Sequence, residues 1–259
     1  MHPHLFTLGS VSVSSYEFFL FLALVAVHFA VYWAADRLGI EDRTVKLTAL
    51  GALVGGVVGA KAMTGLVYWV SLDQSAEALQ RGLGAMSDTG LFVFAEILIG
   101  LAAWMLSKDP LRVLDVWAFA AVIGSPIGRL GCLMAGCCYG QATTMPWGLT
   151  YPHTHHGAIA ARGLPLHPTP LYMAAGVFCV WLLLRAMIQR RTPPGSILIT
   201  AWLGYATVRF SVEFFRADLS RGAWFGDTLT TYQLIVATAA VLHLLLAARL
   251  WSRPQPSTV

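Results

Sequence analysis

The sequence has few charged residues for its length. Only 12% of its 259 residues are Asp, Glu, Lys or Arg, whereas 57% are hydrophobic. This charged share is about half that of an ordinary soluble domain. The net charge of +4 comes mostly from short loops, so it does not indicate nucleic-acid binding. We therefore predict an all-α, polytopic membrane protein that forms a single domain over residues 1–259.

Two further patterns are missing. The N-terminal MHPHLFTLGS lacks a basic stretch followed by a short apolar core and a cleavage site, so no removable signal peptide is predicted. The four cysteines include no C-x-x-C pair of the kind that indicates zinc. His153, His155 and His156 have no acidic or cysteine partner at a fixed spacing, and we interpret them as part of an interfacial loop.

Seven apolar segments are long enough, or nearly so, to cross a bilayer as helices. They are approximately residues 16–35, 45–72, 91–106, 113–134, 171–188, 197–215 and 229–251. A long loop over residues 139–169, rich in aromatic residues, proline and histidine, is expected to lie at the headgroup level.

Basic residues alternate between the loops. Those after the first, third and fifth segments and at the C-terminus hold Arg37, Arg43, Lys46, Lys108, Arg112, Arg185, Arg190, Arg191, Arg249 and Arg253. The other loops hold only Arg81, Arg162, Arg216 and Arg221. The positive-inside rule then predicts an N-terminus outside and a C-terminus in the cytoplasm.

Ionisable residues within the apolar segments are functional candidates, because charge is costly there. They are Glu17, His28, Lys61, Glu96, Arg129, Arg209, Glu213 and His243. Each also has a structural interpretation, as a member of a buried pair or as a side chain that reaches the interface. Lys61 interrupts the glycine-rich LVGGVVGAKAMTG, where small residues favour tight packing, and we expect it to reach the interface or to pair with an acid such as Glu96 or Glu17.

The densest polar set is Tyr205, Arg209, Glu213 and Arg216, whose spacings of four, four and three place them on one helical face. An Arg209–Glu213 pair that only stabilises the bundle is one interpretation. In the other, Glu213 holds Arg209 toward a phosphate, whose oxygens suit the guanidinium fork. Arg129 lies in another segment, and two arginines that converge on one phosphodiester would form a phospholipid-headgroup site.

Three cysteines follow Arg129 closely, at Cys132, Cys137 and Cys138. Three interpretations stay open. Two of the thiols could form a disulfide, the cysteines could serve as small residues that permit close helix packing, or Arg129 could activate one thiol as a nucleophile.

The segment GRLGCLMAGCCYG at residues 128–140 resembles the signature of the bacterial prolipoprotein diacylglyceryl transferase family, G-R-x-G-N-F-x-N-x-E-x-x-G. Further similar motifs follow the family's order across most of the chain. They are Gly59-Ala60-Lys61, Pro146-Trp147-Gly148, His167-Pro168 with Leu171-Tyr172, the Tyr205-to-Arg216 stripe, Gln233 and an opening Tyr16.

The resemblance implies an enzyme of the bacterial cytoplasmic (inner) membrane with the seven-span topology predicted above. It would transfer the diacylglyceryl group of phosphatidylglycerol to the cysteine thiol of a prolipoprotein signal peptide, with no metal or soluble cofactor. The implied catalytic residues are Arg129, Arg209, Glu213, Tyr205 and Glu96. The implied substrate-binding residues are Tyr16, Lys61, Cys132, Cys137, Gly140, Trp147, His167, Arg216 and Gln233.

The chain departs from the family at polar positions. Cys132 and Cys137 replace the signature asparagine and glutamate, and Ala95-Glu96-Ile97 replaces a histidine-containing H-G-G, which makes Glu96 the candidate base. These changes suggest a divergent member or paralogue with another acceptor. The alternatives are a phospholipid-binding or transport bundle without catalysis and a membrane thiol-redox protein that uses its three clustered cysteines.

Overall fold

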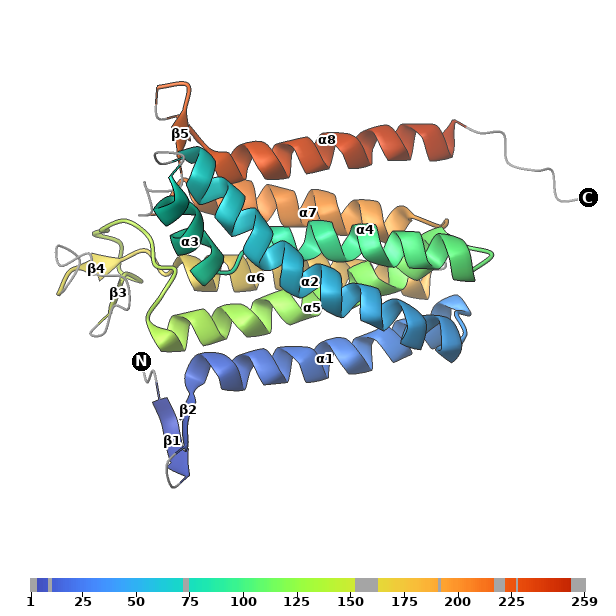
Figure 1. The fold of residues 1–259 in the computed structure, drawn as a ribbon, viewed down its shortest axis with the longest axis horizontal. Helices are drawn as coiled ribbons and strands as arrows, with labels where there is room; N and C mark the ends of the chain where they lie inside the picture. Colours follow the sequence, from blue (N-terminus) through green and yellow to red (C-terminus); the bar gives the residue numbers. More distant parts are fainter. Residues whose placement is uncertain are drawn as a thin grey trace, which may run out of the picture.

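The computed structural model describes residues 4–8, 11–71, 75–151, 163–190, 192–216, 222–226 and 228–252. Long helices lie side by side along the longest axis of the molecule, and the short helix α3 packs near the end of α2 (Figure 1). The helices of the described residues are α1 (Ser15–Leu38), α2 (Asp42–Ser71), α3 (Ala76–Gly84), α4 (Asp88–Leu106), α5 (Pro110–Ala135), α6 (Thr169–Gln189), α7 (Ser196–Glu213) and α8 (Thr231–Trp251).

One end of the bundle gathers the functional candidates, and we call it the site end. Helices α1, α4, α6 and α8 begin there, and α2, α5 and α7 end there (Figure 1). Three short antiparallel strand pairs also lie at this end. They are β1 (His4–Leu8) with β2 (Val11–Ser14), β3 (Leu149–Thr150) with β4 (Pro165–Leu166), and β5 (Ala223–Trp224) with β6 (Leu229–Thr230).

The all-α expectation therefore holds for the bundle but not for its connections. Helix α3 and most of the strands fall in predicted tails or loops, whereas β6 takes the first two residues of the seventh expected segment. Strands of two to five residues carry too weak a periodicity to be recognised in the sequence. Helix α3 is nine residues long and begins at a Ser75 cap, whose hydroxyl accepts from the Ala78 amide.

Six of the helices are long and apolar enough to cross a membrane: α1, α2, α4, α5, α6 and α8. Helix α7 coincides with the sixth expected segment, but it is not among them, and it carries Arg209 and Glu213. It packs against α5, α6 and α8, and most of its side chains are buried. Its two charged side chains, Arg209 and Glu213, are buried and therefore face protein and not lipid.

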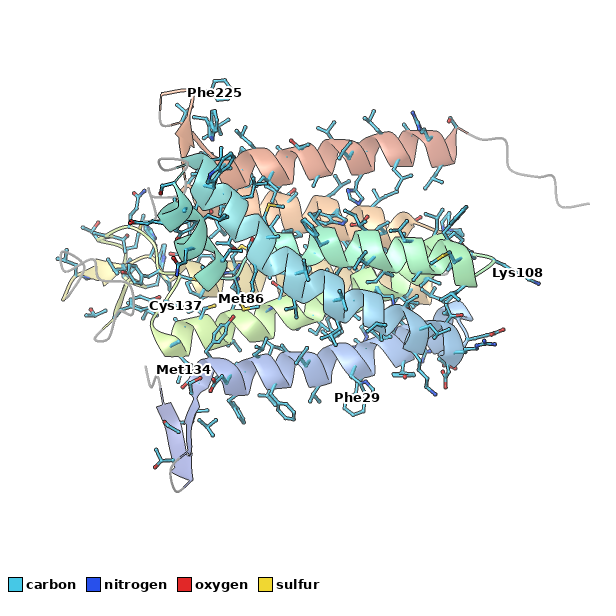
Figure 2. All side chains as sticks on the ribbon, in the orientation of Figure 1. Phe29, Met86, Lys108, Met134, Cys137 and Phe225 are labelled. Carbon is cyan, nitrogen blue, oxygen red and sulfur yellow. The ribbon has the colours of Figure 1, made fainter. Side chains whose placement is uncertain are left out.

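The outer faces of the helices are apolar, as a lipid environment requires. Phe29 on α1 projects away from the bundle (Figure 2), and Trp104 on α4 is 77% exposed. Between the helices, a continuous core includes Phe119 of α5 and Trp202 of α7. This distribution confirms a multi-pass membrane protein.

Glycines bring α2 and α4 into close contact. A Cβ added at Gly59 would lie 2.4 Å from the carbonyl oxygen of Gly90, and one at Gly55 would lie 2.6 Å from that of Phe94. Only glycine permits such an approach of two backbones. The tight packing expected of the glycine-rich segment is confirmed.

A carboxylate fixes the start of α7 at the end opposite to the site. Asp115 of α5 is fully buried and accepts hydrogen bonds from the amides of Gly195 and Leu198, each at 2.9 Å. These amides belong to the helix start, where backbone donors lack intrahelical partners. The contact sets the position of α7 relative to α5, and so the height of the polar groups on both helices.

Candidate functional site

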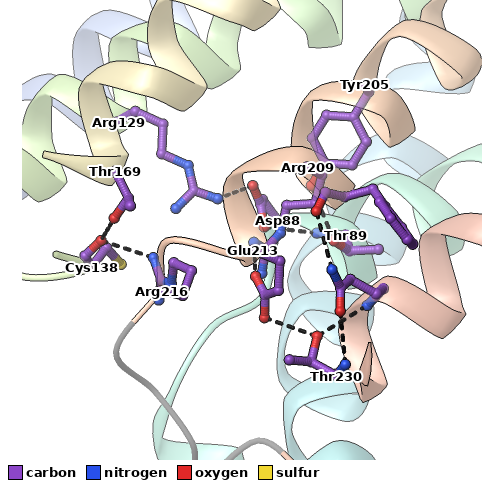
Figure 3. A network of polar contacts seen from close by, with 12 residues as sticks. Asp88, Thr89, Arg129, Cys138, Thr169, Tyr205, Arg209, Glu213, Arg216 and Thr230 are labelled. Atoms are coloured by element: carbon purple, nitrogen blue, oxygen red, sulfur yellow. Dashed lines mark hydrogen bonds and ion pairs between the residues drawn. The ribbon is translucent and has the colours of Figure 1, made fainter. Parts of the chain in front are cut away.

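An ion pair joins α5 to α4 at the site end. The Nη2 atom of Arg129 donates to Oδ2 of Asp88, the first residue of α4 (Figure 3). The helix N-terminus favours a carboxylate there. The Arg129 side chain is 12% exposed. Asp88 is not among the residues predicted from the sequence, although Ser87-Asp88-Thr89-Gly90 directly before an apolar run is typical of a helix start.

A second arginine is held within α7. Nη1 of Arg209 donates to Oε2 of Glu213, and both side chains are almost fully buried. Oε1 of Glu213 accepts from the Thr230 hydroxyl at 3.1 Å. The Arg209 guanidinium also lies over the Tyr232 ring, 5.2 Å from its centroid. Its Nε atom is buried and has no hydrogen-bond partner within the described part of the chain.

The two arginines meet at one carboxylate. Asp88 lies within electrostatic range of both Arg129 and Arg209, which come from different helices. Tyr205, one turn before Arg209, borders the same three charges, and its hydroxyl lies 3.0 Å from that of Thr89. The structure thus brings Arg129, Tyr205 and Arg209 together, as Figure 3 shows.

The start of α8 completes this network. Thr230 and Gln233 form a capping box, in which the Thr230 amide donates to Oε1 of Gln233 at 2.8 Å. Nε2 of Gln233 then donates to the carbonyl oxygen of Phe210 at 3.2 Å. Gln233 therefore orients Thr230, which in turn holds Glu213.

Arg216 lies beyond the end of α7 and not on the helical stripe that the spacing predicted. Its backbone forms a bridge with Gly140, and its Nη1 donates to the carbonyl oxygen of Cys138 at 2.9 Å. A Cβ at Gly140 would lie 2.2 Å from the Phe215 carbonyl oxygen, so this close approach requires glycine. Arg216 is thereby positioned to hold the loop after α5.

Tyr16 borders the same region from α1. A Cβ at Gly131 of α5 would lie 3.5 Å from the Tyr16 Cα atom, so the two helices touch here. The Tyr16 hydroxyl is within electrostatic range of Arg129 and of the cysteines that follow it. Tyr16 therefore joins the polar cluster.

The three cysteines after Arg129 are close together. Their Sγ atoms all lie within 4.8 Å of one another, and none forms a disulfide. Cys132 is on the last turn of α5, and the helix ends before Cys137 and Cys138. Hydrogen bonds from the other two thiols, followed by the charges of Arg216 and Arg129, hold the pKa of the Cys138 thiol well below its usual value.

Trp147 and His167 meet at one hydroxyl. Nε1 of Trp147 donates to the Tyr172 hydroxyl at 2.7 Å, and Nδ1 of His167 lies 3.0 Å from the same oxygen. The His167 ring packs 5.0 Å from that of Phe215, the neighbour of Arg216. This aromatic group forms a rim beside the arginines.

Two predicted residues have other partners. Nζ of Lys61 donates to the carbonyl oxygen of Leu83 in α3 at 3.1 Å. In the described part of the chain, Lys61 therefore binds a backbone oxygen and not the carboxylate of Glu96 or Glu17. Glu96 accepts from Nε1 of Trp202 and lies 3.1 Å from Nε2 of His243. It is eight residues along α4 from Asp88, a rise of about 12 Å. His153, His155 and His156 lie outside the described residues.

A model of the prolipoprotein diacylglyceryl transferase family matches residues 3–251, nearly the whole chain. The chain belongs to the prolipoprotein diacylglyceryl transferase family. This confirms the resemblance drawn from the motifs, and with it the prediction of a membrane transferase.

Relatives named phosphatidylglycerol–prolipoprotein diacylglyceryl transferase cover most of the chain. The one from Geobacter sulfurreducens is 33% identical over 222 residues, 83% of this chain and 82% of its own. That from Pseudoalteromonas translucida is 27% identical over 90% of this chain and 86% of its own. The protein named phosphatidylglycerol–prolipoprotein diacylglyceryl transferase 2 from Clostridium perfringens is 26% identical over 80% of this chain and 80% of its own.

Proposed function

We propose that this family member transfers the diacylglyceryl group of phosphatidylglycerol, or of a similar anionic phospholipid, to the cysteine thiol of a prolipoprotein. The observation that carries the proposal is the meeting of Arg129 and Arg209 at Asp88. Two guanidinium groups from different helices form a binding place for one phosphodiester. The names of the relatives supply the donor and the acceptor.

Both arginines keep donors for a phosphate. Arg129 is bound to Asp88 through Nη2 and is partly accessible, and the buried Nε of Arg209 lacks a partner among the described residues. A buried donor without an acceptor is rare, and a phosphate oxygen would supply the acceptor for this one. Glu213 and Asp88 hold the two side chains in place, so little reorganisation is needed when a phosphate binds.

In the proposed reaction the acceptor sulfur forms a bond to the glycerol carbon that carries the phosphate ester. The carbon–oxygen bond breaks, glycerol phosphate leaves with the bonding electrons, and the thiol proton passes to a base. Arg129 and Arg209 stabilise the charge that develops on the leaving phosphate. Tyr205, Arg216, Gln233 and Tyr16 shape the site around that phosphate.

The proposal includes the orientation in the membrane. Helix α7 would be the seventh span, so that α1 begins outside and α8 ends in the cytoplasm, within one domain of the bacterial cytoplasmic membrane. Helix α1 begins at the site end and α8 ends opposite to it (Figure 1), and Lys108 lies at that opposite, more basic end (Figure 2). Residues 139–169 would form the outer loop that meets the signal peptide.

The test is release of glycerol phosphate from labelled phosphatidylglycerol by purified protein with a cysteine-containing lipobox peptide. We expect Arg129→Ala and Arg209→Gln each to lower the rate about a hundredfold, since each removes one charged hydrogen-bonding group from the leaving phosphate. Arg190→Ala, at the exposed opposite end of α6, is the matched control and should keep the wild-type rate.

Two results would count against the proposal. Equal rates in the two arginine variants and the wild type would show that Arg129 and Arg209 do not stabilise the leaving phosphate. Retained phospholipid binding without release for any acceptor would favour the non-catalytic bundle. Growth of a strain depleted of its own diacylglyceryl transferase, when this chain is expressed, would establish the prolipoprotein as acceptor.

A further inference from the structure

Cys132, Cys137 and Cys138, which we call the thiol triad, form the one group of three metal-ligating side chains found among the described residues. We propose that the thiol triad binds a single Cu(I) ion. This site lies beside the arginines but is separate from them, and the inference does not rest on the transferase function. The sequence has no C-x-x-C motif that would predict this metal site, because the thiols come together only where helix α5 ends.

The backbone arranges the triad before any ion binds. Gly136 is left-handed, with φ +74°, and the Cys137 amide donates to the Cys132 carbonyl oxygen at 3.0 Å, the pattern of a Schellman cap. This turn folds Cys137 back over the last turn of α5. The Cys137 thiol is thereby placed beside that of Cys132.

Cys138 is held in an unusual conformation. Its φ of +61° is left-handed, which is uncommon for a residue with a side chain. Its carbonyl oxygen accepts hydrogen bonds from the Thr169 hydroxyl and from Nη1 of Arg216, which hold the backbone there. Such a conformation persists where the surroundings over-determine it, and functional sites are frequent among such places. Here the conformation turns the third thiol toward the other two.

The number and kind of ligands favour Cu(I). An ion at the metal–thiolate distance of about 2.3 Å lies in the plane of three sulfurs about 4 Å apart, which the limit of 4.8 Å between the Sγ atoms accommodates. Thiolates are soft ligands that select Cu(I) and Zn²⁺. Structural zinc sites take four protein ligands, and no His, Cys, Asp or Glu in the described ranges adds a fourth to the triad, whereas three thiolates complete the coordination of Cu(I).

Charge and access agree with this choice. Three thiolates around a monovalent ion carry excess negative charge, and the guanidinium groups of Arg129 and Arg216 both lie within electrostatic range of the triad. Cys137 and Cys138 are only partly buried, and Cys137 lies at the site end of the bundle (Figure 2). An ion can therefore reach the thiols from that end.

The test uses the full chain, purified in detergent with a reductant under anaerobic conditions and titrated with Cu(I) against a chromophoric Cu(I) chelator. The wild type should retain one ion per chain, with an X-ray absorption spectrum of three sulfur ligands. Cys132→Ser, Cys137→Ser and Cys138→Ser should each weaken retention at least about tenfold, since loss of even a hydrogen-bond partner of a ligand costs that much. Cys179→Ser, which changes the remaining cysteine on an exposed face of α6, should match the wild type.

The thermal unfolding midpoint provides the folding control. Added Cu(I) should raise it in the wild type and in Cys179→Ser, because a ligand that binds only the folded state stabilises it. Added Cu(I) should leave the unfolding midpoint of the triad variants unchanged. Retention of Cu(I) by a triple Cys132, Cys137 and Cys138→Ser variant would overturn the proposal, as would a site filled by Zn²⁺ in preference to Cu(I) or a disulfide that persists under reductant.

Discussion

Arg129 of α5 donates to Asp88, the residue with which α4 begins, and this ion pair joins the two helices at the site end. Asp88 also lies within electrostatic range of Arg209, which Glu213 holds, so one carboxylate faces the charges of both guanidinium groups. An isolated arginine at this depth would be costly. With Asp88 in place, the charge of Arg129 is partly compensated.

We expect Asp88→Asn to lower the rate of glycerol phosphate release about ten- to a hundredfold. Hydrogen bonds to charged groups are worth about 1.5 to 3 kcal/mol, and this one orients Arg129. Asp36→Asn, on an exposed position of α1, is the control and should keep the rate. A faster rate in Asp88→Asn would show that Asp88 competes with the lipid phosphate for Arg129.

Glu96 can be tested as base or as scaffold. Its carboxylate binds Trp202 and His243 about 12 Å along α4 from Asp88, so we expect Glu96→Gln to lower the unfolding midpoint and to reduce the rate less than tenfold. His243→Ala should destabilise in the same way. A hundredfold loss of rate with an unchanged midpoint would instead assign Glu96 the role of base that the family comparison suggested.

The contact between α2 and α4 should tolerate no added methyl group at Gly59. A Cβ there would lie 2.4 Å from the Gly90 carbonyl oxygen, so Gly59→Ala should cost about 1 to 3 kcal/mol of unfolding free energy. Gly100→Ala is the matched control on α4, because its Cβ would meet only Leu114 side-chain atoms at 3.9 Å. Equal unfolding midpoints for the two variants would disprove the close approach.

Asp115 should matter for stability and not for chemistry. Asp115→Ala leaves the Gly195 and Leu198 amides without their acceptor, and we expect a loss of about 2 to 4 kcal/mol in unfolding free energy. Asp109→Ala removes a half-exposed cap of α5 and should cost about 0.5 to 2 kcal/mol. The rate per folded molecule should stay at the wild-type value in both, since both lie opposite to the site.

The local sequence pattern predicted the long helices but not the structure of the segments that connect them. Each apolar run predicted a helix, and the spacing of Arg209 and Glu213 predicted their pair, which the structure confirms. Arg216 was placed on the same face, but α7 ends at Glu213, so Arg216 instead bridges to Gly140. A spacing rule applies only while the helix continues.

Composition, apolar runs and motif order by themselves determined a multi-pass helical membrane protein of the diacylglyceryl transferase family, and they predicted Arg129 and Arg209 as its central residues. These features can be read along the chain, because none of them depends on which distant residues come into contact. Only the tertiary structure decided that Asp88 pairs with Arg129 in range of Arg209, that Glu96 pairs with His243 and that three thiols converge. Such partners are set by how helices distant in sequence pack and by where a helix ends, and neither is encoded in a spacing.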